Sequence, residues 1–94
     1  MNQINVLVVE DTKEESDLLS KILGENGFNI VGIATTFKKA VSLFYEKDFD
    51  IAIVDIFLGE RPDGIAFAEF IDAQPKKLKP FIFLTSSTSR QIFD

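Results

Sequence analysis

Four short apolar segments, evenly spaced along the chain, constrain the fold more than any other feature of the sequence. They are rich in β-branched and aromatic residues and cover residues 4–9, 29–34, 50–56 and 80–85. They begin roughly every 25 residues, which is the spacing of strand–helix–strand units rather than of hairpins. Three of them contain consecutive apolar residues (VLVV, IAIV and FIFL), which is typical of strands covered on both faces, as in a parallel sheet. The second contains Gly32 and is predicted to be an edge strand.

The segments between the predicted strands have the period of amphipathic helices. Helices are predicted over residues 12–23, 37–45 and 63–73. The first is expected to end at Gly24 and Gly27, and the third at Pro75. The apolar side of the first helix is expected to consist of Leu18, Leu19, Ile22 and Leu23. Alternating strands and helices with right-handed crossovers predict an α/β fold: a doubly wound parallel sheet of the flavodoxin-like type, with strand order 2-1-3-4.

The C-terminal part of this fold is expected to be incomplete. A further helix is predicted to begin at about Ser87, and the sequence stops at Asp94 inside it. A complete unit would need roughly 25 to 30 more residues for that helix and a fifth strand. We therefore expect residues 1–94 to form one domain that lacks the fifth strand and the last helix. The fourth strand would then be an open sheet edge, and the side of the first helix around Leu18, Leu19 and Ile22 would be uncovered. Self-association is predicted, by edge pairing of the fourth strand or by exchange of segments between chains.

Composition excludes several classes of function. The chain has no Cys and no His, which excludes disulfides, thiolate and zinc sites, and His-based acid–base catalysis. Its formal net charge of −5 argues against direct nucleic-acid contact, because the domain would repel the phosphates. No apolar run is long enough to span a membrane, and the start MNQINV lacks the basic residues of a signal peptide. The expected location is cytoplasmic.

Three carboxylates are predicted to meet at the carboxyl edge of the sheet. Glu10 and Asp11 follow the first strand, and Asp55 lies at the end of the third. These strands are neighbours in a doubly wound sheet, and ligands bind beyond their carboxyl ends. Crowded acids either keep a proton or bind a cation, and Mg²⁺ is the natural cation for an all-oxygen site. A carboxylate beside Mg²⁺ is placed to attack phosphorus, and Thr85 offers a hydroxyl to a phosphoryl oxygen.

With these residues in place, the sequence resembles the receiver domain of two-component response regulators over essentially its whole length. The likeness lies in VLVVED, IAIVDIFLG, PDGIAFAEFI and PFIFLTS. The separations, 45 residues from Glu10 to Asp55 and 30 from Asp55 to Thr85, are also similar to those of the family. The resemblance implies a signalling domain that takes phosphate on Asp55 from a sensor histidine kinase or a phosphotransfer protein. It implies Mg²⁺ as cofactor and a regulatory module rather than an enzyme acting on a metabolite.

The resemblance also implies a role for each site residue. Asp11 and Asp55 would bind Mg²⁺ directly, together with the backbone carbonyl of Phe57. Glu10, where the family more often has Asp, would act through a metal-bound water. Thr85 would be the switch hydroxyl, which moves toward the phosphoryl group and couples phosphorylation to movement of loops and helices.

Two further features of the family bear on this sequence. Phe57 and Ser87 stand where the family tunes its rate of dephosphorylation, and we expect the bulk of Phe57 to shield the acyl phosphate from water. The family also places a Lys at the end of the fifth strand, where it contacts the phosphoryl group. That position would lie beyond Asp94. The lysines that precede the fourth strand are expected at the opposite end of the sheet and cannot replace it; these are Lys76, Lys77 and Lys79.

Each of these residues also has a purely structural alternative. Asp11 or Thr12 would cap the first helix, and Thr85 would cap a following one. Gly64 would supply loop geometry, and the ten Phe residues would form the core. Asp55 has the weakest structural alternative, because an unpaired charge inside IAIVDIFL costs several kcal/mol of desolvation.

Two other functions are compatible with the same fold. The first is a binding or oligomerisation module that does not switch, because the phosphate-contacting Lys is absent. The second is a Mg²⁺-dependent phosphatase of similar fold, which uses a second Asp two residues after its nucleophile. Phe57 stands at that position here, which argues against a phosphatase.

Overall fold

The computed structural model describes residues 3–59, 61–74 and 80–84 of the 94-residue chain. Within these residues, strands and helices alternate as the sequence predicts. The strands are β1 (Asn5–Val9), β2 (Asn29–Ala34), β3 (Ile51–Asp55) and β4 (Phe81–Leu84). The helices are α1 (Lys13–Glu25), α2 (Phe37–Glu46) and α3 (Asp63–Asp72). The helix predicted near Ser87 lies outside the described residues.

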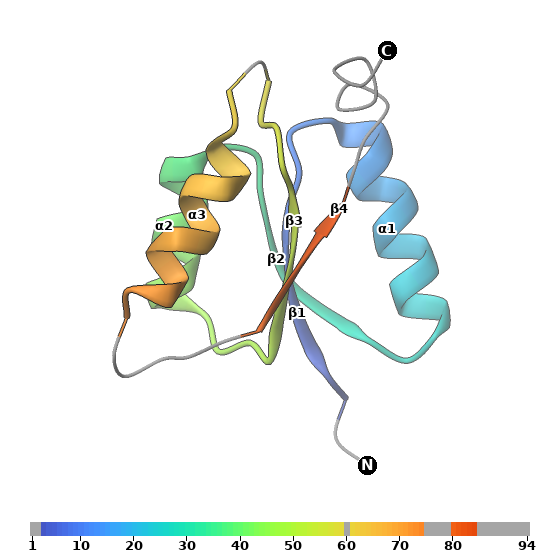
Figure 1. Ribbon diagram of the computed structural model, residues 1–94. Coiled ribbons are helices and arrows are strands. Elements are labelled where there is room, and N and C mark those ends of the chain that lie inside the picture. The colour runs from blue at the N-terminus through green and yellow to red at the C-terminus, as the bar shows by residue number, and fades with distance from the viewer. Residues whose placement is uncertain (1–2, 60, 75–79, 85–94) are drawn as a thin grey trace.

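The four strands form one parallel sheet in the order β2-β1-β3-β4, which confirms the predicted doubly wound arrangement. Figure 1 shows α2 and α3 together on one face of this sheet and α1 on the other. β1 and β3 are the inner strands, and Val9 of β1 is level with Val54 of β3. Because parallel neighbours end at the same edge of a sheet, the residues that follow Val9 and Val54 are brought side by side.

The main hydrophobic core lies between the sheet and the helix pair α2–α3. From the two inner strands it takes alternate residues, Leu7 and Val9 of β1 and Ala52 and Val54 of β3. The helices add fully buried side chains, chiefly Ala40, Leu43, Phe44, Phe67 and Ile71. The approach of α2 to the edge strand β2 depends on Gly32, where an added Cβ would lie 3.1 Å from a methyl carbon of Leu43. This core fixes both inner strands and so fixes the positions of their carboxyl ends.

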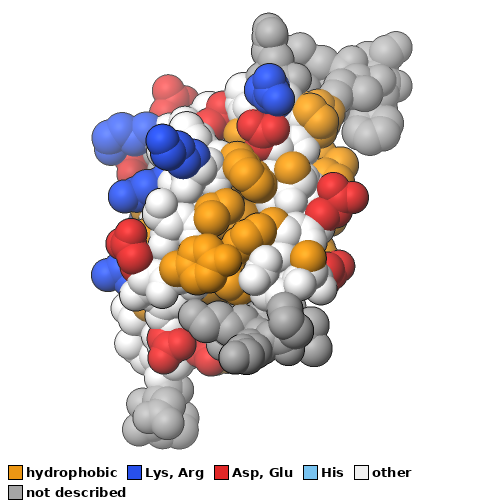
Figure 2. All heavy atoms as spheres, turned by 90° about the vertical axis from the view of Figure 1, so that its left-hand side faces the viewer, with side chains coloured by type: hydrophobic (Ala, Val, Ile, Leu, Met, Phe, Trp, Pro, Cys, Tyr) orange, Lys and Arg blue, Asp and Glu red, His pale blue; other side chains and the backbone are white. Residues whose placement is uncertain are grey.

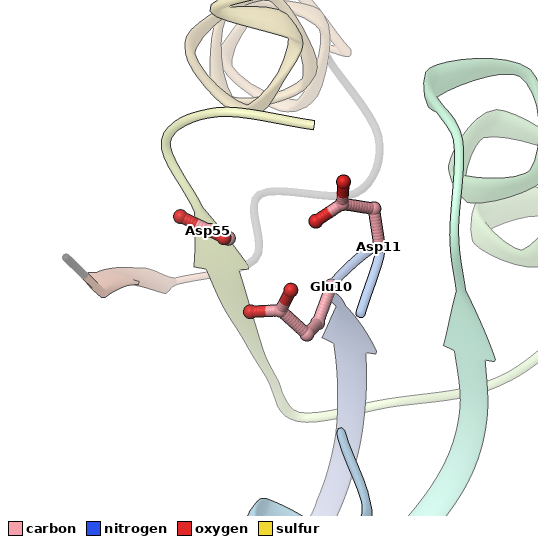
Figure 3. Close-up of side chains that lie close together, drawn as sticks. All are labelled: Glu10, Asp11 and Asp55. Carbon is pink, nitrogen blue, oxygen red and sulfur yellow. The ribbon is translucent and has the colours of Figure 1, made fainter. Parts of the chain in front are cut away.

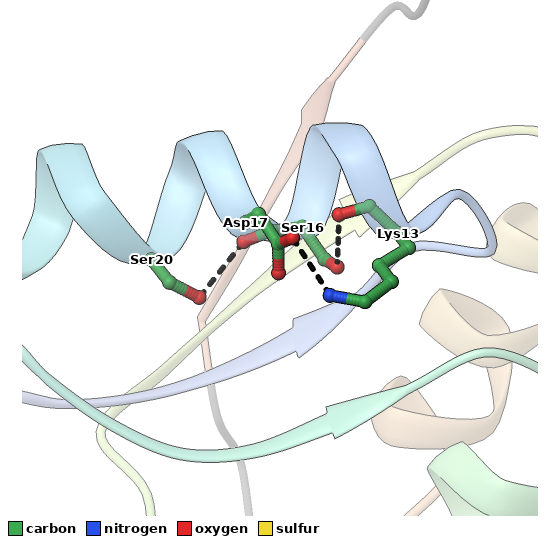
Figure 4. Close-up of polar contacts among 4 residues, drawn as sticks. All are labelled: Lys13, Ser16, Asp17 and Ser20. Atoms are coloured by element: carbon green, nitrogen blue, oxygen red, sulfur yellow. Dashed lines mark hydrogen bonds and ion pairs between the residues drawn. The ribbon is translucent and has the colours of Figure 1, made fainter.

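Part of the apolar side of helix α1 is open to solvent, as expected for the side around Leu18 and Ile22. Leu18 and Ile22 are 58% and 47% exposed, whereas Leu19 and Leu23 are half-buried. The buried position of the first turns is Ser16, whose hydroxyl donates to the carbonyl of Lys13 at 3.0 Å (Figure 4). A small side chain with its polar atom satisfied lets the helix lie close to the strands, so the sheet-facing side of α1 is centred on the row that contains Ser16.

The end of α1 differs from the prediction that Gly24 stops this helix, because Gly24 lies inside it. The helix stops at a turn in which Phe28 N donates to Leu23 O at 2.9 Å and Gly27 N donates to Gly24 O at 3.2 Å. Gly27 has φ of 86°, a left-handed conformation that a glycine adopts without a steric penalty. The stop signal of this helix is therefore Gly27 alone.

The phenylalanines divide between the core and partly open positions, so the prediction that all of them are core residues is wrong. Phe44, Phe49 and Phe67 are fully buried, whereas Phe83 in β4 is 40% exposed. β4 is an edge of the sheet among the described strands, and its Ile82 is 51% exposed. Self-association through β4 stays a prediction. Within the described part of the chain, no helix has the length and apolar character needed to cross a membrane.

Candidate functional site

Three carboxylates converge at the carboxyl edge of the two inner strands. Glu10 and Asp11 directly follow β1, and Asp55 is the last residue of β3. One oxygen from each lies within 4.8 Å of the others. Figure 3 shows Glu10 and Asp11 turned toward Asp55 across the gap between the strand ends. The predicted meeting of these side chains is therefore confirmed, while their roles toward a metal ion or phosphate stay predictions.

Glu10 is only 1% exposed and is held by the start of α1. Its Oε2 accepts hydrogen bonds from Thr12 N and from Thr12 Oγ1, both at 3.0 Å. Among the described residues, its Oε1 is buried and has no hydrogen-bond partner. A buried carboxylate oxygen without a donor is costly, so this atom marks the place where a ligand would bring the largest gain.

Asp11 is half-buried and is directed by a contact across 48 residues of sequence. Its Oδ2 accepts a hydrogen bond from the backbone N–H of Gly59 at 2.6 Å, which ties the end of β1 to the loop that follows β3. Burial raises the pKa of Asp11; the Gly59 N–H opposes this rise, and Glu10 adds to it. The Gly59 N–H therefore gives the Asp11 side chain a partner outside helix α1. Thr12 is the N-cap residue of α1, but its side chain makes no capping hydrogen bond. The capping alternative is therefore wrong for Thr12.

Asp55 carries the strongest electrostatic perturbation in the site. Its side chain is 1% exposed, and burial, followed by the neighbouring charge of Glu10, raises its pKa to about 7. Its Oδ1 accepts from Phe57 N at 3.4 Å, a long contact that only partly opposes the rise. At neutral pH the carboxyl group of Asp55 is therefore divided between its protonated and charged forms.

No described cation neutralises this cluster. The ion pairs in residues 3–59, 61–74 and 80–84 are Lys13–Asp17 at 2.9 Å and Arg61–Asp63 at 3.4 Å, and neither includes a site carboxylate. The atoms that this site offers to a metal ion are all carboxylate or carbonyl oxygens, which Mg²⁺ and other hard divalent cations prefer. The unpartnered Glu10 Oε1 and the raised pKa of Asp55 both indicate a site that lacks positive charge. The residues present therefore fit a divalent cation.

Two glycines, Gly59 and Gly64, support the site in ways that the sequence pattern did not predict. Gly59 has φ of 70° and donates its N–H to Asp11. The sequence feature that could have indicated this role is a Gly placed soon after a buried strand. Gly64 lies in the first turn of α3, so the prediction that it supplies loop geometry is wrong. Its N–H donates to Ile56 O at 3.0 Å, and an added Cβ would overlap the carbonyl oxygen of Asp55. Only a residue without a side chain lets α3 begin this close to Asp55.

The remaining predicted residues lie partly inside and partly outside the described part of the chain. Phe57 is half-buried directly beyond β3, with its backbone N–H on Asp55. The proposed use of its carbonyl oxygen as a metal ligand stays a prediction. Thr85 and Ser87 lie outside the described residues, as do Lys76, Lys77 and Lys79.

Comparisons with known proteins agree on one family. The family model described as the response regulator receiver domain matches residues 6–93. The transcriptional regulatory protein MalR of Bacillus subtilis (strain 168) is 36% identical over 85 residues, which make up 89% of this chain and 36% of MalR. The chain thus spans about a third of the length of this curated relative.

Solved structures give the same result. The solution NMR structure of the PhyR response regulator REC domain of Erythrobacter litoralis has a TM-score of 0.80 and 29% identity, and the match covers 98% of this chain and 70% of that one. The anti-anti-sigma factor PhyR of Bartonella quintana, crystallised in complex with the anti-sigma factor NepR, has a TM-score of 0.79 and 27% identity. That match covers 86% of this chain and 32% of PhyR.

Proposed function

Because this chain belongs to the response regulator receiver domain family, we propose that it accepts a phosphoryl group on Asp55 in a Mg²⁺-dependent reaction. The family is regulatory, and its members belong to two-component signalling. The proposed donor is a sensor histidine kinase or a phosphotransfer protein. The proposed readout is a change in the surface that a downstream partner recognises.

The single observation that carries this proposal is the convergence of three carboxylates with a buried, unpartnered oxygen among them. A purely structural cluster of this kind would be destabilising, because like charges repel and buried charges lose hydration. A site that binds a cation and then a phosphoryl group uses the same features. Asp55, at the end of β3, is the acid whose position matches the phosphoacceptor of the family.

In the proposed step, a carboxylate oxygen of Asp55 attacks phosphorus and forms an acyl phosphate. The phosphorus–nitrogen bond to the donor imidazole breaks, and the imidazole nitrogen leaves with that electron pair. Asp55 must be charged to attack, and its pKa of about 7 leaves part of the population charged at neutral pH. Asp11 would hold the cation directly and Glu10 through a water, and Gly59 N–H keeps Asp11 oriented toward the site.

A bound Mg²⁺ would neutralise charge on the phosphoryl oxygens and favour the charged form of Asp55. The residues proposed to hold it are Asp11 and Asp55 directly, the Phe57 carbonyl, and Glu10 through a water. Thr85 is proposed as the switch hydroxyl.

Intact-mass measurement tests the proposal directly. The 94-residue chain is incubated with a small phosphoramidate donor, with Mg²⁺ or with a chelator. We expect one phosphoryl adduct with Mg²⁺, little without it, and none in Asp55→Asn. Asp50→Asn is the matched control, because Asp50 lies at the other end of the same strand, and it keeps the adduct. An adduct of equal yield in Asp55→Asn would contradict the assignment.

A second function is favoured by one observation: within the described residues, no Lys or Arg forms an ion pair with the three carboxylates. It is a receiver-fold binding module that does not switch. Its signature is Mg²⁺-dependent stabilisation with no phosphoryl adduct under conditions that phosphorylate another receiver domain. The PhyR of Bartonella quintana was crystallised with an anti-sigma factor, so a protein partner is the proposed ligand of such a module.

A further inference from the structure

Two threonines stand at the same position, the start of a helix, and use their hydroxyl groups differently. Thr36 is the N-cap residue of α2, and its Oγ1 accepts a hydrogen bond from Lys39 N at 3.1 Å. Thr12 is the N-cap residue of α1, and its side chain makes no capping hydrogen bond. Both residues have an extended backbone, which is the conformation that N-cap residues adopt. The backbone of Thr12 therefore does not prevent it from capping.

The sequence favours capping at Thr12 more than at Thr36. Thr12 and Glu15 have the spacing of a capping box, in which the hydroxyl accepts from the N–H of the Glu and the Glu reaches back to the N-cap residue. The corresponding residue of α2 is Lys39, which cannot reach back in this way. A Thr that gives up a favourable cap breaks a local rule, and such exceptions are expected at functional sites.

The hydroxyl of Thr12 is used by Glu10 instead. Thr12 Oγ1 and Thr12 N both donate to Oε2 of Glu10, each at 3.0 Å. Glu10 is 1% exposed, and its other oxygen, Oε1, is buried without a hydrogen-bond partner among the described residues. Figure 3 shows the Glu10 side chain at the gap that it shares with Asp11 and Asp55. Both donors of Thr12 thus bind one oxygen and leave the other for a ligand in this gap.

A glutamate benefits from such a contact because its side chain is long. It has several rotatable bonds, and fixing them costs conformational entropy. The two hydrogen bonds from Thr12 fix the Glu10 carboxylate before any ligand is bound. A ligand then meets an oxygen that is already in place, and the cost of ordering it is not charged to binding.

We propose that Thr12 is a positioning residue of the cation site, which holds Oε2 of Glu10 so that Oε1 stays available to a water of the bound cation. This inference rests on the proposed function, because it requires a Mg²⁺ ion at the three carboxylates. Thr12 acts through Glu10 and does not contact the ion. Partners that orient the groups around a metal ion commonly determine its affinity.

The Mg²⁺ dissociation constant tests this role. It is obtained from urea unfolding of the full 94-residue chain at increasing Mg²⁺ concentration. Thr12→Val replaces the hydroxyl with a methyl group, and we expect it to raise the constant about fivefold. This is less than the roughly tenfold loss typical for partners of direct ligands, because Glu10 acts through a water. Thr12→Ser keeps the hydroxyl and should restore the wild-type constant.

Thr36→Val is the matched control, because it removes a hydroxyl that does cap a helix. Helix α2 lies on the face of the sheet opposite α1 (Figure 1), on the side of the molecule where Figure 2 shows hydrophobic side chains between charged ones. Thr36→Val should lower the urea midpoint equally with and without Mg²⁺ and leave the Mg²⁺ dissociation constant unchanged. A purely structural role of Thr12 would give this same result.

A double-mutant cycle shows whether Thr12 acts through Glu10. In a Glu10→Ala protein, adding Thr12→Val should not raise the Mg²⁺ dissociation constant further. Two results would overturn the inference and leave the metal site in place: a wild-type constant in Thr12→Val, or the same effect of Thr12→Val with and without Glu10.

Failure of the proposed function gives a different result. A wild type that Mg²⁺ does not stabilise would overturn both the metal site and the role of Thr12. A chain that binds Mg²⁺, shows the expected effect of Thr12→Val and takes no phosphoryl group would overturn the phosphoacceptor function alone.

Discussion

The two ends of the β1–β3 strand pair carry the same kind of side chain in different circumstances. At the amino end, Asp50 is exposed, and its Oδ2 accepts a hydrogen bond from Asn5 N at 2.7 Å. At the carboxyl end, Asp55 is 1% exposed, it accepts a hydrogen bond from Phe57 N at the long distance of 3.4 Å, and its pKa is raised to about 7. Both are aspartates that border β3, so residue type does not explain the difference.

Burial and neighbouring charge explain it. Asp50 is exposed and lies beside the backbone N–H of Asn5, whereas Asp55 is buried beside the carboxylate of Glu10. A carboxylate only accepts hydrogen bonds, so Asp50 finds a donor in the strand edge itself. Asp55 and Glu10 are buried next to each other with few donors among the described residues, so a proton, a loop N–H or a cation stabilises them. The amino end of the sheet therefore holds a structural acid, and the carboxyl end holds acids that are available for chemistry.

The largest expected effect comes from adding one carbon atom at the carboxyl end. Gly64→Ala sets a methyl group on the carbonyl oxygen of Asp55, with the carbonyl of Ile56 only 2.8 Å away, so α3 must move. We expect the free energy of unfolding, measured with urea, to fall by about 3 kcal/mol or more. Gly24→Ala is the matched control, because Gly24 is inside α1 with nothing within 4 Å of an added Cβ. It should stabilise the protein by about 0.5–1 kcal/mol, and equal effects of the two changes would contradict the close approach.

Mg²⁺ should act on one end of the strand pair and not on the other. At pH 8 and a Mg²⁺ concentration of 100 times its dissociation constant, linkage predicts about 2.7 kcal/mol of stabilisation. Asp50→Asn should keep this gain, because Asp50 does not face the site. Asp55→Asn should lose most of it. The measurement is urea unfolding with and without Mg²⁺, and a wild type that Mg²⁺ does not stabilise would remove the metal site from the proposal.

Without metal, amide replacements at the two ends should change stability in opposite directions. At pH 8, Asp50→Asn weakens the charged acceptor for Asn5 N–H and should cost about 1 kcal/mol. Asp55→Asn removes a buried charge that has no cation and should stabilise the protein by about 2 kcal/mol. The same sign for both variants would refute the explanation from burial and neighbouring charge.

The pH dependence follows from the raised pKa of Asp55. The folded protein holds this proton up to about pH 7, whereas the unfolded chain releases it near its ordinary value of 3.8. The contribution of Asp55 to stability is therefore most favourable at low pH and decreases as pH rises from about 4 to about 7. The advantage of Asp55→Asn over the wild type should be close to zero at pH 4 and largest above pH 7. An advantage that does not change with pH would assign it to packing instead of charge.

The sequence was sufficient for those parts of the site that depend on strand order. The runs VLVV and IAIV predicted two buried parallel strands, and the acids that follow them had to meet once these strands were neighbours. Glu10, Asp11 and Asp55 were found in this way, before any contact was known.

The other features of the site depend on contacts that cannot be predicted from the spacing of apolar residues in the sequence. The hydrogen bond from Gly59 to Asp11 requires a loop residue with φ of 70°, and the role of Gly64 requires the actual distance between α3 and β3. The packing of α1 has a similar origin. The apolar pattern located the open side around Leu18 and Ile22, but it did not show that Ser16, with its satisfied hydroxyl, is buried against the sheet.

The smallest expected effect concerns Phe57, which continues from the carboxyl end of β3. Its ring is half-buried next to the acid that is proposed to carry the phosphoryl group, and its backbone N–H contacts Asp55 at 3.4 Å. An acyl phosphate is lost by attack of water, and an apolar ring at this position excludes water where an amide would bind it. Phe57→Asn should therefore speed loss of phosphate about fivefold, which corresponds to about 1 kcal/mol in the barrier. Phe57→Leu keeps an apolar side chain and should stay near the wild-type rate. The rates are measured by intact mass after the donor is removed, and equal rates for all three proteins would show that the ring does not shield Asp55.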